Sequence, residues 1–256
     1  MGKNILVLPD IHGRTFWKEP CKHIEDYEKV IFLGDYLDPY DFENISVQDA
    51  ISNFREIVEF KKKNAEKVIL LLGNHDMPYF SDEYYCFSIG HCRHSRIFHK
   101  EIADIFNEAK RLFRIAYVYE DILFTHAGVT YEWLSNVVKC EDTNINKICG
   151  ILNELIQSRE GLQKLFYITS QRGGRDRYAS CVWADVYDMM WDYEANTEKE
   201  IHKIKQIFGH TMQAFYDTNR NIVFGDSIEF GNCKMLDTAK PYVVNASSFE
   251  TKIAEY

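Results

Sequence analysis

The sequence feature that most constrains the fold is a set of five short polar blocks, each of which directly follows an apolar run. The blocks are Asp10–Gly13, Gly34–Asp38, Gly73–Asp76, Thr125–Gly128 and Gly209–Thr211. The apolar runs have the length of strands, and those before the first three blocks lack polar alternation, which is typical of strands covered on both faces. Because α/β proteins gather reacting groups where strands end, the pattern predicts an α/β protein with one polar site.

The first third of the chain predicts a strand–helix–strand unit. Apolar runs at 4–9, 29–33 and 67–72 are the expected strands, and residues 46–63 repeat apolar side chains at helical spacing. Ser46 and Asp49 resemble a capping box at the start of this helix. This strand–helix–strand order predicts a right-handed crossover and a parallel pair of strands. Further helices are expected over 95–111, 131–138, 144–158 and 161–166, a Gly/Arg loop over 171–178, and further strands over 113–119, 121–125, 204–208, 221–224 and 241–244.

Composition narrows the class of protein. The 256 residues show no internal repeat and no Pro/Ser-rich linker, which favours one domain over residues 1–256. The net charge of -9 argues against general binding to nucleic acids or membrane surfaces. No segment approaches the ~20 apolar residues of a membrane span, and the start is too short for a signal-peptide core. Seven scattered cysteines without a C-x-x-C pair indicate reduced thiols and a cytoplasmic protein.

The polar blocks contain residue types that bind divalent metals. Asp10 and His12 stand two apart, so in an extended segment both side chains share one face. Asp35 has two carboxylate oxygens, which can bridge two cations about 4 Å apart. Taken singly, each such residue also suits an ordinary turn after a strand, but together they predict a two-metal site. The candidate ligands are Asp10, His12, Asp35, Asn74, His126 and His210.

His75 is a candidate for proton transfer. In an extended chain it points away from the neighbouring Asn74. Asp38 could hydrogen-bond one ring nitrogen, which would fix the tautomer and raise the pKa of the histidine. His75 would then protonate a leaving alkoxide. The alternative is a buried structural histidine that Asp76 or the backbone satisfies.

A second cluster of histidines and cysteines lies between residues 86 and 99. Its members are Cys86, His91, Cys92, His94 and His99. Their spacing does not match a zinc finger. We interpret the segment as a solvated or substrate-facing basic stretch with Arg93 and Arg96, and a structural zinc site is the alternative.

The blocks resemble those of the calcineurin-like metallophosphoesterase superfamily. The resemblance is closest to its serine/threonine protein phosphatase branch with bacterial and phage relatives, including diadenosine tetraphosphatases. It rests on PDIHG (9–13), FLGDYLD (32–38), LLGNHD (71–76), FTHAG (124–128) and FGHT (208–211). It implies a four-layer α/β/β/α sandwich of two mixed sheets flanked by helices, with the metals at the strand ends.

The resemblance also implies roles for the residues. Metal 1 would be held by Asp10, His12 and bridging Asp35, and metal 2 by Asp35, Asn74, His126 and His210. His75 with Asp38 would donate the proton, while a hydroxide between the metals attacks phosphorus. Two manganese ions, or an iron/zinc pair, would suit the mixed nitrogen and oxygen ligands.

Two departures from the family pattern bear on the substrate. Met212 stands where many nuclease and phosphodiesterase members have a second histidine, which favours the protein-phosphatase-like branch. Pro39 follows Asp38, where that branch usually has an arginine that clamps the phosphate. No arginine closely follows Trp183, near which a second family arginine usually lies. The candidate replacements are Arg14, Arg172, Arg175 and Arg177.

We therefore expect a phosphoester hydrolase, most simply a phosphomonoesterase of the serine/threonine protein phosphatase type. Its partner would be a phosphorylated protein or small molecule. One alternative is a hydrolase of dinucleoside polyphosphates or other small nucleotides. Another is a metal-binding scaffold with weak catalysis, which the absent arginine favours and the intact His75 and Asp38 oppose. The sequence sets no oligomeric state.

Overall fold

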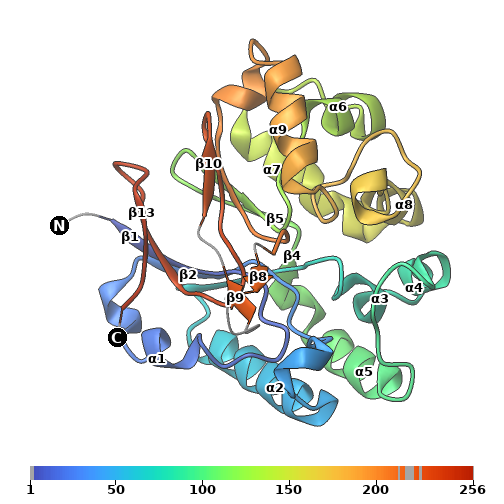
Figure 1. Cartoon of the computed structure of the whole chain (residues 1–256), viewed down its shortest axis with the longest axis vertical. Helices are drawn as coiled ribbons and strands as arrows, with labels where there is room; N and C mark the ends of the chain where they lie inside the picture. Colours follow the sequence, from blue (N-terminus) through green and yellow to red (C-terminus); the bar gives the residue numbers. More distant parts are fainter. Residues whose placement is uncertain (1–2, 213, 217–221, 225–226, 256) are drawn as a thin grey trace. The chain divides into compact units, whose positions relative to one another are not determined.

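The computed structural model describes residues 3–212, 214–216, 222–224 and 227–255 (Figure 1). The chain forms two compact units. The first comprises Met1–Arg114 with Ala239–Tyr256, and the second comprises Ile115–Thr238. Each unit has its own mixed sheet and its own helices, so the predicted α/β class with two mixed sheets flanked by helices is confirmed. That the units form one domain stays a prediction.

The first unit is built on a six-stranded sheet. Its order is β13-β12-β1-β2-β3-β4, and the four strands from β1 to β4 run parallel. Leu8 pairs with Phe32, and Phe32 pairs with Leu70, so β1, β2 and β3 end at the same edge. The strands are β1 (Asn4–Leu8), β2 (Lys29–Phe32), β3 (Val68–Leu71), β4 (Phe113–Arg114), β12 (Tyr242–Asn245) and β13 (Thr251–Ile253).

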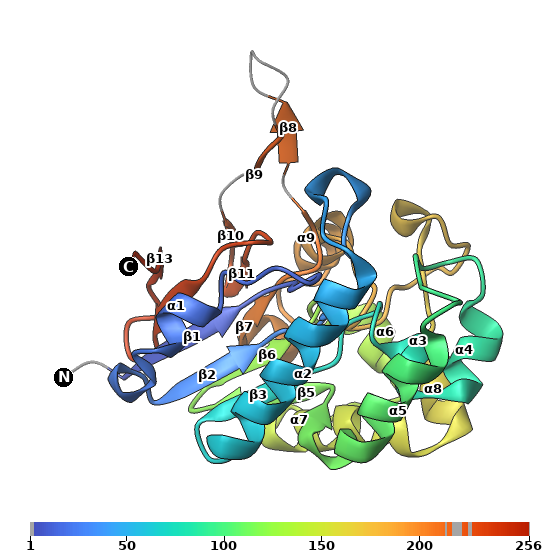
Figure 2. The same cartoon turned by 90° about the horizontal axis from the view of Figure 1, so that it is seen from below.

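Helices α2 and α5 cover one face of this sheet (Figure 2). The side chain of Ser46 accepts the N–H of Asp49 at the start of α2, which caps the helix as the sequence predicts. Phe54 of α2 and Phe106 of α5 are buried with ring centroids 4.7 Å apart. The predicted parallel pairing of β2 with β3, with helix α2 between them along the chain, is confirmed. The helices are α1 (Lys18–Cys21), α2 (Val47–Lys63), α3 (Met77–Phe80), α4 (Asp82–Ser88) and α5 (His99–Ala109).

The second unit has a five-stranded sheet in the order β10-β11-β7-β6-β5, with β8 and β9 as a separate antiparallel pair. Helices α6 to α9 gather on one side of it (Figure 1). The strands are β5 (Ala116–Tyr119), β6 (Ile122–Thr125), β7 (Lys205–Phe208), β8 (Ala214–Tyr216), β9 (Ile222–Phe224), β10 (Ile228–Phe230) and β11 (Cys233–Met235). The helices are α6 (Tyr131–Trp133), α7 (Ile145–Glu154), α8 (Arg159–Leu165) and α9 (Val186–Ala195).

The structure divides one expected strand between two sheets. Residues 113–119 were expected as a single strand, but β4 joins the first unit and β5 joins the second. The cause is visible at the break, where the side-chain oxygen of Asn153 accepts the N–H groups of Ile115 (2.8 Å) and Ala116 (3.1 Å). These bonds replace the ladder bonds that a continuous strand would make. The expected strand 221–224 is present as β9, and residue 221 lies outside the described residues.

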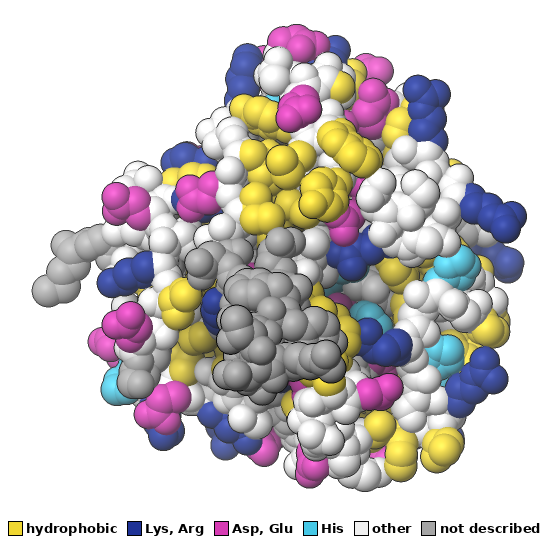
Figure 3. Space-filling model, viewed as in Figure 1, with side chains coloured by type: hydrophobic (Ala, Val, Ile, Leu, Met, Phe, Trp, Pro, Cys, Tyr) yellow, Lys and Arg dark blue, Asp and Glu magenta, His cyan; other side chains and the backbone are white. Residues whose placement is uncertain are grey.

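One helix prediction also needs correction, and one helix of the structure is not predicted. The helix expected from residue 95 begins at His99. The N–H of Ser95 donates to the Tyr79 hydroxyl, and the Ser95 hydroxyl accepts the N–H of Phe98, so residues 95–98 form a turn before the helix. Helix α9 is not predicted from the sequence, because its apolar residues do not form one stripe. Tyr187 and Trp191 are each 54% exposed, and Figure 3 shows hydrophobic side chains gathered over α9. In the described part of the chain, no helix combines the length and apolar character needed to cross a bilayer.

Candidate active site

The first two polar blocks are tied together by the backbone. The N–H of His12 donates to the carbonyl of Asp35 (2.6 Å), and the N–H of Gly13 donates to that of Tyr36 (2.9 Å). These bonds continue the pairing of β1 with β2 beyond the ends of the strands. The loop after β1 is therefore held against the loop after β2.

The backbone of the candidate site is strained. A positive φ is uncommon for residues other than glycine and costs on the order of 1–3 kcal/mol each. Such strain persists only where surrounding bonds enforce it, and it clusters at functional sites. Five predicted site residues have a positive φ: Asp10 (38°), His12 (42°), Asp35 (53°), Asp38 (57°) and His210 (69°).

Asp76 fixes the loop after β3 to the loop after β2. Its carboxylate accepts the N–H groups of Asp35 (2.7 Å), Tyr36 (2.9 Å) and Gly73 (2.8 Å). The side chain is fully buried, and burial together with Asp35 raises the pKa of Asp76. The sequence suggests Asp76 only as a hydrogen-bond partner of His75. The role as a clamp was missed, because it depends on backbone groups that lie far away in the sequence.

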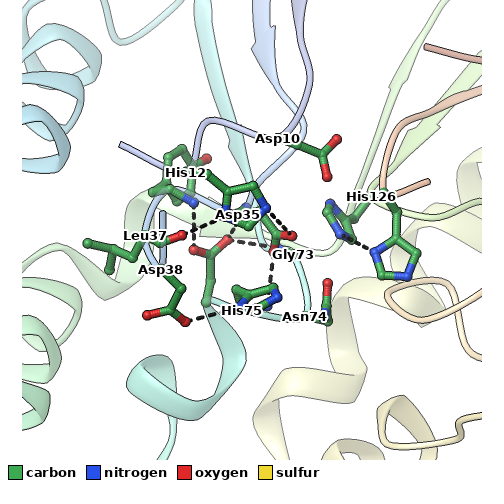
Figure 4. A network of polar contacts seen from close by, with 12 residues as sticks. Asp10, His12, Asp35, Leu37, Asp38, Gly73, Asn74, His75 and His126 are labelled. Atoms are coloured by element: carbon green, nitrogen blue, oxygen red, sulfur yellow. Dashed lines mark hydrogen bonds and ion pairs between the residues drawn. The ribbon is translucent and has the colours of Figure 1, made fainter. Parts of the chain in front are cut away.

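Asp35 lies beside two histidines (Figure 4). One carboxylate oxygen accepts the backbone N–H of His75 (2.9 Å), and the other lies 3.5 Å from Nε2 of His12. Nδ1 of His12 donates to the carbonyl of Leu37 (2.7 Å). Because Nδ1 carries the proton of the neutral ring, Nε2 has the lone pair that can bind a metal. Burial lowers the pKa of His12 by more than Asp35 raises it, so the ring is neutral. A neutral imidazole is the form that binds metals.

His75 is held by acceptors on its Nδ1 side. This atom lies 3.0 Å from Oδ2 of Asp38 and 3.1 Å from the carbonyl oxygen of Arg93. Because both neighbours accept, Nδ1 carries a proton, and Nε2 is left for proton exchange. Burial alone lowers the pKa of His75, but the carboxylates of Asp35 and Asp38 together raise it above the usual value. The hydroxyl of Tyr79 donates to the other oxygen of Asp38 (2.7 Å).

The donors in the first unit fit a divalent metal. His12, Asp35 and His75 each offer a ligand atom within 4.8 Å of the others, and all three are buried. Asp10 and Asn74, which follow β1 and β3, are also buried. Carboxylate, amide and imidazole groups form a mixed oxygen and nitrogen shell that suits manganese, iron or zinc.

The second unit supplies a histidine pair. His126 follows β6 and His210 follows the parallel neighbour β7, and the N–H of Gly209 donates to the carbonyl of His126 (2.8 Å). Nε2 of His126 lies 3.0 Å from Nδ1 of His210, and both side chains are buried. Nitrogen atoms bound to one ion at about 2.0–2.1 Å lie roughly this far apart. The pair therefore suits two ligands of a single ion.

Two of the four candidate arginines are engaged by carboxylates. Arg14 is buried, forms a two-point ion pair with Glu43 and donates to the carbonyl of Asp10 (2.9 Å). Arg172 pairs with Asp185 (2.9 Å) and donates to the carbonyl of His210 (3.2 Å). These contacts hold the loops that carry the candidate ligands.

The other two candidates, Arg175 and Arg177, are exposed, and the guanidinium of Arg177 lies 5.4 Å from the ring centroid of Tyr178. Contact of any of the four arginines with phosphate stays a prediction.

Arg93 is the arginine that the structure brings to His75. Its guanidinium donates to the carbonyl of Asp38 (3.1 Å) and lies 3.8 Å from the ring centroid of Tyr40. The sequence predicts that Arg93 lies in a solvated or substrate-facing basic segment, but Arg93 is not among the predicted phosphate-binding residues. The absence of an arginine after Asp38 is the feature of the sequence that could have indicated a role for Arg93.

Comparison with known proteins shows the family of the chain. The family model for calcineurin-like phosphoesterases matches residues 3–214, and no curated protein sequence matches the chain. The cold-active protein-tyrosine phosphatase of the psychrophile Shewanella sp. has a TM-score of 0.57 and 13% identity, covering 100% of this chain and 81% of that one. At this identity the likeness shows the fold alone.

Two further solved structures are similar at lower TM-scores. A putative diadenosine tetraphosphatase scores 0.45 with 12% identity, covering 99% of this chain and 94% of that one. A metallophosphoesterase from Sphaerobacter thermophilus scores 0.47 with 12% identity, covering 99% and 89%. The family match itself extends over most of the sequence and includes all five polar blocks. The chain therefore belongs to the calcineurin-like phosphoesterase family of metal-dependent phosphoric ester hydrolases.

Proposed function

We propose that this protein is a phosphomonoesterase of the serine/threonine protein phosphatase type that works with two divalent metal ions. The observation that carries the proposal is the contact of His75 with Asp38 beside the buried donors His12 and Asp35. A scaffold that only binds metal has no need of a histidine whose pKa is raised by two carboxylates. An ester hydrolase needs such a group, because the leaving alkoxide must gain a proton.

The metal ligands in this proposal come from all five polar blocks. Asp10, His12 and Asp35 would hold one ion, and Asp35, Asn74, His126 and His210 the other. The chain would then act as one domain, which the family match across residues 3–214 supports. When bound, two manganese ions, or an iron/zinc pair, would neutralise phosphate charge and lower the pKa of a water molecule.

The protein's own residues position the reaction and supply its proton. Neutral His12 is held by Leu37 with Nε2 toward Asp35, so no proton has to leave the ring before it binds a cation. Protonated His75 donates from Nε2 to the oxygen of the leaving group. Asp38 keeps the ring oriented and stabilises its charged form, and Tyr79 keeps the Asp38 carboxylate in place.

The test is hydrolysis by the manganese-loaded protein. We expect phosphate release from p-nitrophenyl phosphate and from phosphoserine or phosphothreonine peptides, with loss of activity after chelation. Diadenosine tetraphosphate is the comparison substrate. Hydrolysis of this nucleotide alone would replace the proposal with a dinucleoside-polyphosphate hydrolase. Two bound ions without turnover of any of these esters would favour a scaffold.

A further inference from the structure

We propose that Arg93 binds the phosphoryl group of the substrate and so replaces the arginine that is missing after Asp38. This inference rests on the proposed phosphatase function. It assigns a residue of the segment between α4 and α5 to the recognition of phosphate. Neither the polar blocks nor the family match of the chain identifies Arg93.

The position of the guanidinium carries the first step. Nη2 of Arg93 donates to the carbonyl oxygen of Asp38 (3.1 Å), which belongs to the peptide group that joins Asp38 to Pro39. Pro39 occupies the position where related sequences are expected to have an arginine. Arg93 therefore reaches that place from 55 residues farther along the chain.

Two further contacts hold Arg93 in place. Its guanidinium lies 3.8 Å from the ring centroid of Tyr40, a distance typical of a stacked cation–π contact. The Tyr40 ring in turn packs edge-on against His12, with 5.1 Å between centroids. The backbone carbonyl of Arg93 accepts from Nδ1 of His75 (3.1 Å). The residue is thus anchored beside a candidate metal ligand and the candidate proton donor.

The guanidinium also retains the capacity to bind an anion. It is exposed, and its hydrogen bonds to the carbonyl of Asp38 and to the side chain of Tyr40 leave others of its five N–H donors available. Among the residues that the structure describes, no carboxylate pairs with Arg93, whereas Glu43 holds Arg14 and Asp185 holds Arg172. A planar guanidinium with adjacent donors suits two-point contact with phosphate oxygens.

The experiment compares Arg93→Gln with Arg96→Gln. Arg96 lies in the same segment, is also exposed and has the same charge, so it is a matched control. We would measure the dissociation constant of inorganic phosphate by calorimetry on the manganese-loaded proteins, then kcat/KM for p-nitrophenyl phosphate. Arg93→Gln should weaken phosphate binding and lower kcat/KM, each on the order of 10- to 100-fold, with two ions still bound. Arg96→Gln should change both values less than twofold.

A third variant, Arg93→Lys, separates charge from geometry. It should restore only part of the phosphate affinity, because an ammonium group lacks the two-point fork. Every variant keeps the backbone carbonyl of residue 93, which accepts from His75. Measurements of folding and of metal content therefore show whether the structure is intact, separately from phosphate binding. Equal phosphate affinities of the Arg93→Gln and Arg96→Gln proteins would overturn the inference.

The two proposals fail in different ways. If the parent protein hydrolyses no phosphomonoester but binds phosphate through Arg93, the proposed phosphatase function is wrong and the assignment of Arg93 stands. If the parent protein hydrolyses monoesters and Arg93→Gln leaves phosphate affinity unchanged, the function stands and Arg93 has no part in phosphate recognition.

Discussion

Nδ1 of His75 lies 3.0 Å from Oδ2 of Asp38, and both residues lie in loops that follow parallel strands. The backbone N–H of the same histidine donates to Asp35. One carboxylate therefore orients the ring and another fixes the main chain. Both favour the charged imidazole, which is the form that can give a proton to a leaving group.

Replacing His75 should affect substrates according to their leaving groups. His75→Asn should lower kcat for an alkyl phosphate by roughly 10²–10⁴-fold, because a general acid contributes about that much. The loss for p-nitrophenyl phosphate should be much smaller, since nitrophenolate leaves without a proton. Steady-state kinetics and metal analysis would check this, with two ions retained as the control. Unchanged turnover of the alkyl phosphate would remove His75 from the mechanism.

Tyr79 should act on turnover through Asp38. Tyr79→Phe loses the bond to Asp38 and the acceptor for Ser95, so the free energy of unfolding should fall by about 1–3 kcal/mol. Its kcat for an alkyl phosphate should also fall, because Asp38 is less well held. Tyr36→Phe is the control, since that hydroxyl donates to the carbonyl of Leu71 instead.

Urea unfolding and kinetics on the same two proteins separate the effects. Both variants should lose stability, but only Tyr79→Phe should lose turnover. Equal losses of kcat would show that Tyr79 contributes to stability alone.

The sequence predicts those parts of the site that depend on local pattern. Parallel strands that end at one edge bring Asp10 and Asp35 into adjacent loops, and this follows from apolar runs and one crossover helix. The placement of Asp38 beside His75 matches the expectation from the polar blocks. The roles of these residues stay predictions.

Other features depend on contacts between distant parts of the chain. Asp76 matters because two N–H groups about 40 residues away point at its carboxylate, which no sequence spacing encodes. Arg93 reaches Asp38 from a loop whose path is set by tertiary contacts, such as the bond from Ser95 to Tyr79. The break at Ile115 likewise depends on a side chain in α7.

Metal binding should stabilise the folded protein through His210. A ligand that binds only the folded state stabilises it by about 2.7 kcal/mol at 100 times its Kd, so manganese should raise the melting temperature. His210→Ala should reduce this rise, because it removes a ligand of one of the two proposed ions. His202→Ala is the matched control, because His202 is also buried in the second unit but pairs with Asp192 (3.2 Å).

His202→Ala should lower the melting temperature of the metal-free protein and keep the rise with manganese. Thermal unfolding with and without the metal would measure both effects. A full rise in the His210→Ala protein would exclude His210 as a ligand.

The close approach of two loops should make Gly34 irreplaceable. Gly34 has a φ of 110°, and a Cβ atom there would lie 2.3 Å from the backbone nitrogen of Gly73. Gly34→Ala should therefore combine backbone strain with a clash that no side-chain rotation relieves, and lower the free energy of unfolding by about 2–5 kcal/mol. Gly90→Ala is the control, because its φ is 93° but no atom lies within 4 Å of the added Cβ.

That control isolates the cost of the positive φ, which should be about 1 kcal/mol. The excess loss in Gly34→Ala measures the contact between the loops after β2 and β3. Because the displaced loop also carries Asp35, the same variant should bind manganese more weakly, whereas Gly90→Ala should bind it normally. Urea unfolding and metal titration would measure both effects. Equal stability losses in Gly34→Ala and Gly90→Ala would mean that the loops after β2 and β3 can move apart without a cost in free energy.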